Sequence, residues 1–149
     1  MLLKSVLGFL MLAVSQLAVL PAVAGDVLPI AIVKADGSKV KFMVEFASTR
    51  EELEVGLMNR EHLDADKGML FDFGREVIAK MWMKDTLIPL DMLFIDRRGK
   101  VIHIAENAEP LSLDLIEAGA PIRYVLEIGG GQSKANGIAT GDKLKLVPR

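Results

Sequence analysis

Residues 27–47 read VLPIAIVKADGSKVKFMVEFA, and this stretch predicts a β-hairpin at the start of the fold. Val27–Lys34 is an apolar, weakly alternating run that ends at Asp36-Gly37, a dipeptide typical of hairpin turns. In Val40–Ala47 every second side chain is apolar, which is the period of a strand with one buried face. We therefore expect two consecutive strands here that share a hydrophobic face.

A short helix is expected directly after the hairpin. Ser48 and Glu51 have the spacing of a capping box, which predicts a helix that begins there and runs to about Asn59. Leu53 and Leu57 fall at helical spacing, so one face of this helix should pack on the sheet.

The rest of the chain reads as short strands separated by turn residues. Strands are expected at 68–73, 77–83, 90–96, 100–106, 123–128 and 143–147. Residues 108–121 are rich in leucine but show no clear period. The pattern predicts an α+β domain, mainly antiparallel β, built as a small closed or partly open barrel or sandwich of about seven strands with one principal α-helix.

Residues 1–24 have the pattern of a secretory signal peptide. Lys4 supplies a positive start, 6–20 is an apolar run shorter than the roughly 20 residues of a membrane span, and Ala22-Val23-Ala24 fits a cleavage site. We expect cleavage near Ala24, a single domain over 25–149, a periplasmic or secreted protein, and contact with the membrane only during export.

Composition excludes several classes of function. The chain carries 18 basic and 20 acidic residues, and loss of Lys4 with the signal would leave a net charge of about −3, which does not suggest nucleic acid as a partner. The sequence contains no cysteine, so disulfides, a thiolate nucleophile and cysteine-ligated zinc are excluded. His62 and His103 lack the spacing of zinc ligands, and no phosphate-binding glycine loop is present, so no cofactor is expected.

The segment Met81–Asp91, MWMKDTLIPLD, is the best candidate for a binding site. It holds the only tryptophan, two methionines and a proline just ahead of a carboxylate, a mixture typical of ligand pockets and also of a well-packed core. Alternation along a strand would place Trp82 opposite Met81 and Met83. The residues that we expect to bind a ligand are Arg60, Met69, Trp82, Met83, Thr86, Asp91 and Glu127.

Several short motifs, in order, are similar to the family called domain of unknown function 192. They are GLMNR at 56–60, GMLF at 68–71, WMKDTLIPLD at 82–91, YVLE at 124–127 and Gly141-Asp142. The resemblance covers about 27–147 and implies a small, often exported prokaryotic protein with a compact β-rich fold and no assigned activity. The chain departs from the family pattern at Met81, where an aromatic is usual, and at 129–132, where Pro-Ala-Gly and an aromatic are common.

We expect a non-catalytic module that binds a small ligand or a peptide around the Met81–Asp91 segment. A first alternative is a hydrolase or lyase that uses Asp91 and Glu127 as acid and base. A second is Cu(I) binding through the thioethers of Met81 and Met83. Binding is favoured because a histidine-based relay, a thiol and a phosphate loop are missing from the sequence.

Overall fold

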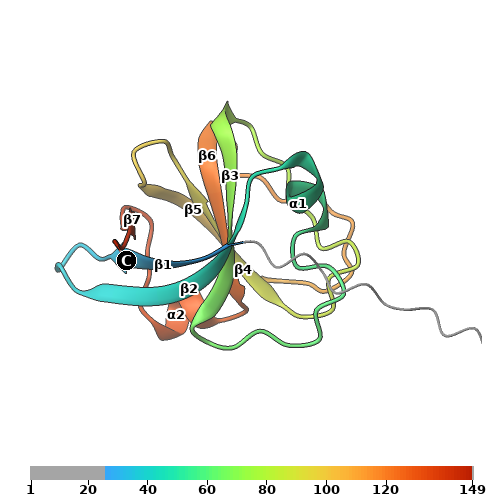
Figure 1. Cartoon of the computed structure of the whole chain (residues 1–149), viewed down its shortest axis with the longest axis horizontal. Coiled ribbons are helices and arrows are strands. Elements are labelled where there is room, and N and C mark those ends of the chain that lie inside the picture. The colour runs from blue at the N-terminus through green and yellow to red at the C-terminus, as the bar shows by residue number, and fades with distance from the viewer. Residues whose placement is uncertain (1–25, 149) are drawn as a thin grey trace, which may run out of the picture.

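Seven strands form one curved sheet in residues 26–148, the part of the chain that the computed structural model describes (Figure 1). The expected signal peptide, residues 1–24, lies outside the described residues. The strands are β1 Val27–Val33, β2 Lys39–Ala47, β3 Lys67–Val77, β4 Leu90–Ile95, β5 Val101–Ala108, β6 Ile122–Gly129 and β7 Lys143–Leu146. The helices are α1 Arg50–Val55 and the single-turn α2 Gln132–Ala135. Within 26–148, neither helix has the length and apolar character needed to cross a bilayer.

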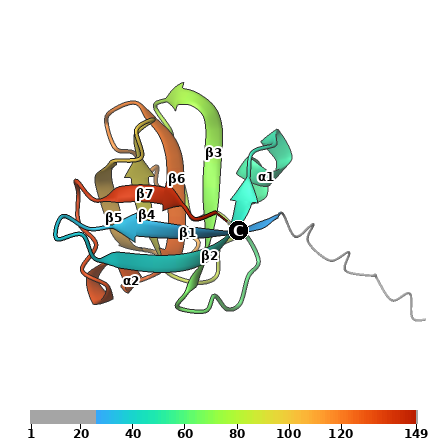
Figure 2. The same cartoon turned by 60° about the vertical axis from the view of Figure 1, so that its left-hand side comes forward.

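The sheet curls into a half-barrel with the strand order β5-β4-β6-β3-β2-β1-β7 (Figure 2). All neighbouring strands are antiparallel except β2 and β3. Hydrogen bonds from the amide of Leu144 to the carbonyl of Gly99 (2.7 Å) and from Val101 to Asp142 (2.8 Å) bring the two edge strands together at one point. The expected mainly antiparallel, partly open barrel is therefore confirmed.

The hairpin of β1 and β2 forms where residues 27–47 predict it. The strands pair from Val27 with Glu45 to Val33 with Lys39. The turn between them contains Gly37 at a φ of 82° and an Asp36 carboxylate that accepts hydrogen bonds from Ser38. Positive φ explains the glycine, because side chains are strained in that conformation.

Two apolar clusters lie on opposite faces of the sheet. The inner cluster is enclosed by the curve and receives side chains from all seven strands, such as Ile30, Phe42, Leu93, Leu126 and Leu144. The outer cluster lies on β3, β4 and β6 and is covered by α1 and two long loops, which Figure 1 shows on the same side of the sheet. Alternation along each strand sends neighbouring residues into different clusters.

The helix begins one residue later than the sequence suggests. Thr49, rather than Ser48, is the N-cap: its hydroxyl accepts from the amide of Glu52, whose carboxylate accepts from the amide of Thr49 at 2.9 Å. The helix ends at Val55 rather than near Asn59, because Gly56 turns to a φ of 48°. A side chain at Gly56 would lie 3.0 Å from the ring of Phe71, so the turn also requires close packing on β3.

The expected strand at 77–83 is not formed. β3 continues to Val77, and beyond it the chain leaves the sheet and makes a single β-bridge, between Met81 and Ile116. The partner of this segment is therefore the leucine-rich loop rather than a strand of the barrel, a pairing that the local pattern of either segment could not predict.

Candidate functional site

The Met81–Asp91 segment separates its apolar side chains onto two sides. Met81 and Met83 are buried in the outer cluster, whereas Trp82 is 44% exposed, with the Lys84 ammonium 5.3 Å from its ring centroid. This is the separation that alternation predicts. Trp82 therefore does not share one pocket floor with Met69 and Met83, which both lie in the outer cluster.

Thr86 is buried and closes the turn at Lys84-Asp85. Its hydroxyl donates to the carbonyl of Lys84 (3.1 Å) and its amide donates to the carbonyl of Met83 (3.1 Å). Asp85 adopts a φ of 52°, and its carbonyl accepts from the amide of Asn59 at 2.7 Å. This bond ties the chain after α1 to the turn, so the motifs at 56–60 and 82–91 meet in space.

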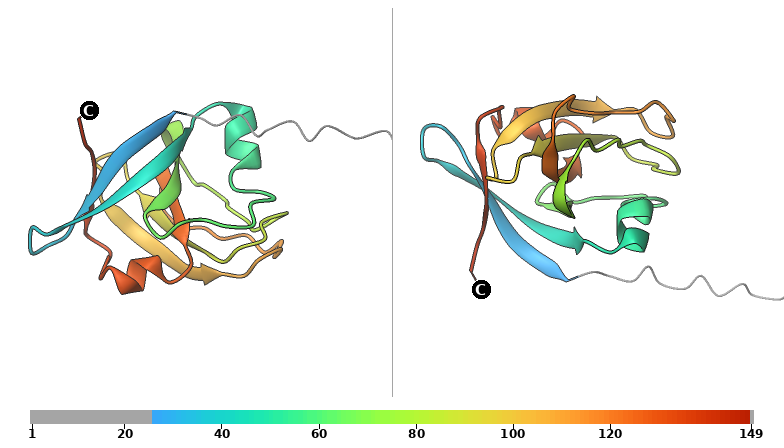
Figure 3. Two further views of the ribbon diagram at one scale, coloured as in Figure 1. Left: turned by 60° about the horizontal axis from the view of Figure 1, so that its bottom comes forward. Right: turned by 90° about the horizontal axis from the view of Figure 1, so that it is seen from above.

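Two long loops pair with each other at the covered side of the barrel. Residues 78–88 and 109–118, which we call the loop pair, run side by side in both views of Figure 3. Met81 and Ile116 exchange two backbone hydrogen bonds of 2.9 Å, Met83 donates to the carbonyl of Ser112 (3.0 Å), and Leu111 donates to that of Thr86 (3.1 Å). The loop pair is therefore a short irregular ribbon anchored by buried side chains.

The outward side of this ribbon is unusually apolar. Leu113 is 65% exposed, and Leu111 and Leu115 are each 58% exposed. Trp82 neighbours Leu115, because the two residues adjoin the bridged pair on its outward side. Exposed apolar groups that gather in one place mark interaction sites more often than isolated ones do.

Leu111 adopts an unusual backbone conformation. Its φ is 65°, a region that leucine rarely occupies and that costs on the order of 1–3 kcal/mol. The side chain is not buried in return, so packing of Leu111 does not offset this strain. The turn at Leu111 precedes the segment that presents Leu113 and Leu115.

Asp91 is fully buried, and its carboxylate is hydrogen-bonded to donors of the protein itself. Its carboxylate accepts from the amides of Asn107 (2.8 Å), Gly131 (2.9 Å) and Ser133 (2.8 Å) and from the hydroxyl of Ser133. Burial by itself would raise the pKa of Asp91, but these hydrogen bonds hold it below the ordinary value of 3.8. Arg60, Arg123 and Lys84 are not among the contacts of Asp91. The arrangement indicates a structural carboxylate that joins β4, the end of β5 and the loop after β6.

Glu127 is a second buried acid with a different environment. Its direct cross-strand neighbours are Met69 and Met92, and all three side chains point to the outer face. It is 4% exposed, and within the described residues no hydrogen bond or ion pair reaches its carboxyl group. Burial raises the pKa of Glu127 to about 8, so the group is neutral at pH 7.

Asp91 and Glu127 face opposite sides of the sheet. Asp91 is opposite Ile128 in the β4–β6 register, and Ile128 belongs to the inner cluster, whereas Glu127 is opposite Met92 of the outer cluster. The structure therefore does not bring the two carboxyl groups of the acid–base hypothesis to one site.

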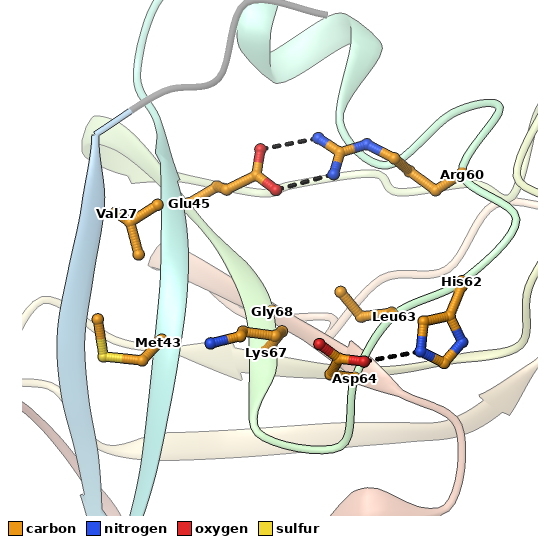
Figure 4. A pocket seen from close by; sticks show the side chains of 9 residues that line it. All are labelled: Val27, Met43, Glu45, Arg60, His62, Leu63, Asp64, Lys67 and Gly68. Carbon is orange, nitrogen blue, oxygen red and sulfur yellow. Dashed lines mark hydrogen bonds and ion pairs between the residues drawn. The ribbon is translucent and has the colours of Figure 1, made fainter.

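Arg60 lies in a cleft beside the sheet (Figure 4). Its guanidinium makes a bidentate ion pair with Glu45 at 2.8 and 2.7 Å, and this hydrogen bonding raises the pKa of Arg60. The cleft has a volume of about 330 Å³ and also contains the hydrogen-bonded side chains of His62 and Asp64, which are 2.7 Å apart. Any anionic ligand at Arg60 would have to compete with Glu45.

A second cleft has a volume of about 380 Å³. It lies beside the same 61–65 loop and extends to residues 88 and 89 of the Met81–Asp91 segment. Ile88, Pro89, Gly130 and Gln132 contribute to its wall. A side chain on Gly130 would approach Pro89 to 2.9 Å, so the chain needs glycine where the loop after β6 contacts the motif. Trp82, Asp91 and Glu127 line neither of these clefts.

Possible metal ligands are scattered or buried. In residues 26–148 no three histidine, aspartate or glutamate side chains gather in a way that could hold a metal ion. The thioethers of Met81 and Met83 lie in the apolar outer cluster with Met69 and Met92, where methionines act as packing groups.

Residues 111–115 and Glu45 are features that sequence reasoning missed. Leu111, Leu113 and Leu115 do alternate with a period of two, but the flanking prolines and the absence of a neighbouring strand pattern hid this signal. Glu45 reads as a polar position of a strand, and only the fold shows that it binds Arg60.

Comparison with known proteins identifies relatives whose function is also open. The family model DUF192, described as "Uncharacterized ACR", matches residues 31–146. The chain is similar to a crystal structure from Sinorhizobium meliloti 1021, provisionally described as a transcription regulator, with 40% identity, a TM-score of 0.82 and coverage of 84% of this chain and 97% of that one. It is also similar to a protein of unknown function from Novosphingobium aromaticivorans DSM 12444, with 36% identity, a TM-score of 0.80 and coverage of 86% and 91%. No curated protein matches the chain.

Proposed function

We propose that this protein, which belongs to the DUF192 family, is a binding module that takes a peptide or protein partner on the loop pair. One observation carries the proposal. Of the ten large apolar side chains that are exposed in residues 26–148, six lie in the loop pair: Ile78, Trp82, Leu87, Leu111, Leu113 and Leu115. Their burial against a partner would supply the main favourable term of binding.

The loop pair also has the rigidity that a binding surface needs. Met81, Met83 and Ile116 pack into the outer cluster beneath it, and Thr86 bonds the turn on one loop and accepts from Leu111 on the other. A surface that is held in place before binding loses less conformational entropy on association. In this proposal the motif at 82–91 supplies Trp82 to the surface and buried anchors below it.

A protein partner is favoured over a membrane or a nucleic acid. The loop pair contains four acids and two bases, Lys80 and Lys84, and its net charge of about −2 disfavours anionic lipid or phosphate as the partner. The provisional description of the Sinorhizobium relative as a transcription regulator therefore does not lead us to propose direct DNA binding here.

Panning of displayed random peptides on the mature chain tests the proposal. We expect enriched peptides whose affinity falls at least about tenfold with Leu113→Asp, since one buried leucine contributes about 1.5–3 kcal/mol. Leu146→Asp is the matched control, because Leu146 is 66% exposed but lies on β7, away from the loop pair.

Two outcomes would contradict the proposal. One is enrichment that is equal on wild type and the Leu113→Asp variant. The other is cosedimentation with phosphatidylcholine vesicles that depends on Leu113 while no peptide is enriched, which would assign the loop pair to a lipid surface instead.

We also propose that the protein acts outside the cytoplasm, because residues 1–24 have the pattern of a signal peptide. Mass spectrometry of the protein from a cell envelope fraction should find a chain that starts near Gly25. A full-length chain confined to the cytoplasm would contradict export.

A further inference from the structure

The outer edge of the 109–118 loop is an unpaired β-edge. Met81 and Ile116 form a hydrogen-bonded pair, and in an antiparallel ribbon alternate residues direct their backbone groups to opposite sides. The amide and carbonyl groups of Leu115, and by the same alternation those of Glu117, therefore point away from the 78–88 loop. Within the described residues these amides form no hydrogen bond. This edge can accept another extended strand.

Exposed apolar side chains lie along and beside this edge. Leu113 and Leu115 are both exposed on the outward side, and Trp82 flanks Leu115 from the neighbouring loop. An added strand would place every second side chain over these apolar groups while its backbone bonds to the edge. Backbone pairing supplies affinity and alternate pockets supply specificity in this mode of recognition.

Charge distinguishes between the segments that could pair here. Glu106, Glu109, Asp114 and Glu117 are exposed, and within residues 26–148 none of them forms an ion pair. Pairing with a second copy would set one acidic edge against another, and like charges across a strand pair are destabilising. A segment with basic residues between its apolar ones complements the edge instead.

We propose that the edge at 115–117 binds an extended peptide segment in which apolar and basic residues alternate, by adding it as a strand to the loop pair. This inference rests on the proposed function, because it specifies how the loop pair takes its partner and which partner chemistry it selects. Trp82 contributes an apolar face beside the added strand, and the exposed acids select the charge.

The test uses three capped nine-residue peptides without tryptophan: alternating leucine and lysine, alternating leucine and glutamate, and the leucine–lysine peptide with every second amide N-methylated. Trp82 is the only tryptophan, so its emission reports on the loop pair of the wild-type protein directly, and isothermal titration gives the affinity. We expect the lysine peptide to bind at least tenfold more tightly than the glutamate peptide, and N-methylation to abolish its binding.

Leu115→Pro removes the outward amide without removing an internal backbone hydrogen bond, and Leu115→Ala keeps the amide. We expect the proline variant to lose binding and the alanine variant to be weakened but active. The N-methylated peptide gives the same test without altering the protein.

Three results would overturn the edge pairing. They are equal binding of the N-methylated peptide, equal binding of the glutamate peptide, and a wild-type dimer in sedimentation that Leu115→Pro abolishes. The first two results would leave the loop pair as a docking surface if Leu113→Asp still weakened peptide binding by at least about tenfold. If no peptide enriched by panning depends on Leu113, the proposed function itself fails.

Discussion

Replacing Glu127 by glutamine should stabilise the protein at neutral pH. The carboxyl group is buried between Met69 and Met92 with no partner among the described residues, and burial raises its pKa to about 8. In the unfolded chain the group titrates near 4.5. Between these two pH values the folded state holds one proton more than the unfolded state, so the free energy of unfolding falls as the pH rises.

The magnitude follows from the two pKa values. Each pH unit well inside this window costs about 1.4 kcal/mol, so wild type loses about 3 kcal/mol between pH 4.5 and pH 7 and about 4 kcal/mol by pH 8. Glutamine has nearly the shape of the protonated acid and does not titrate. The variant Glu127→Gln should therefore match wild type near pH 4.5 and exceed its stability by about 3 kcal/mol at pH 7.

Urea unfolding followed by far-ultraviolet circular dichroism, at half-unit steps from pH 5 to pH 8, measures the difference. Glu106→Gln is the control, because Glu106 is an exposed acid on β5 and its replacement should leave the slope of wild type unchanged. A wild type whose stability follows the same pH dependence as Glu127→Gln would refute the reasoning. So would a glutamine variant that is less stable at pH 7, since that result requires a partner that favours the ionised form.

Five further substitutions test three other sites of the fold. Asp91→Ala should lower the free energy of unfolding by about 3–5 kcal/mol, because it leaves buried amides without their acceptor. Ser133→Ala should lower it by only about 1–3 kcal/mol. Urea unfolding at pH 7 measures both changes. Because the pKa of Asp91 is lowered, its contribution to the free energy of unfolding is complete above about pH 4 and should be lost as the pH falls through the folded pKa. A difference in stability between wild type and Asp91→Ala that is unchanged at about pH 2 would contradict this assignment. Gly68→Ala places a methyl group 2.4 Å from a carbonyl oxygen of β6 and should destabilise the fold by about 1–3 kcal/mol, and an unchanged midpoint would show that the strands do not approach so closely. Thr49→Ala should cost about 1 kcal/mol and Ser48→Ala much less, and the reverse order in thermal unfolding would restore Ser48 as the helix cap.

The structure confirms the elements whose sequence signals come from neighbouring residues. The hairpin at 27–47 depends on alternation and an Asp-Gly turn, which are properties of neighbouring residues. The helix after it was placed within a residue or two at its start, because Thr49 and Ser48 both offer a hydroxyl three residues ahead of a glutamate. The error at 77–83 has a different origin: an apolar, alternating segment fits a ribbon of two loops as well as a strand of the barrel.

The sequence by itself determined which side chains can share a side of one extended segment. It placed Trp82 opposite Met81 and Met83, because alternation requires only an extended backbone. The sequence could not determine which residues or which solvent each side of the segment faces. The register of β4 against β6 sends Asp91 to the inner side and Glu127 to the outer side, and the long-range pairing of the loops leaves Leu113 and Leu115 in solvent. These outcomes depend on contacts between residues far apart in the chain. Only the tertiary structure therefore decides that Asp91 accepts several hydrogen bonds, whereas Glu127 is buried without a donor among the described residues. It also decides that Leu113 and Leu115 form part of an exposed surface.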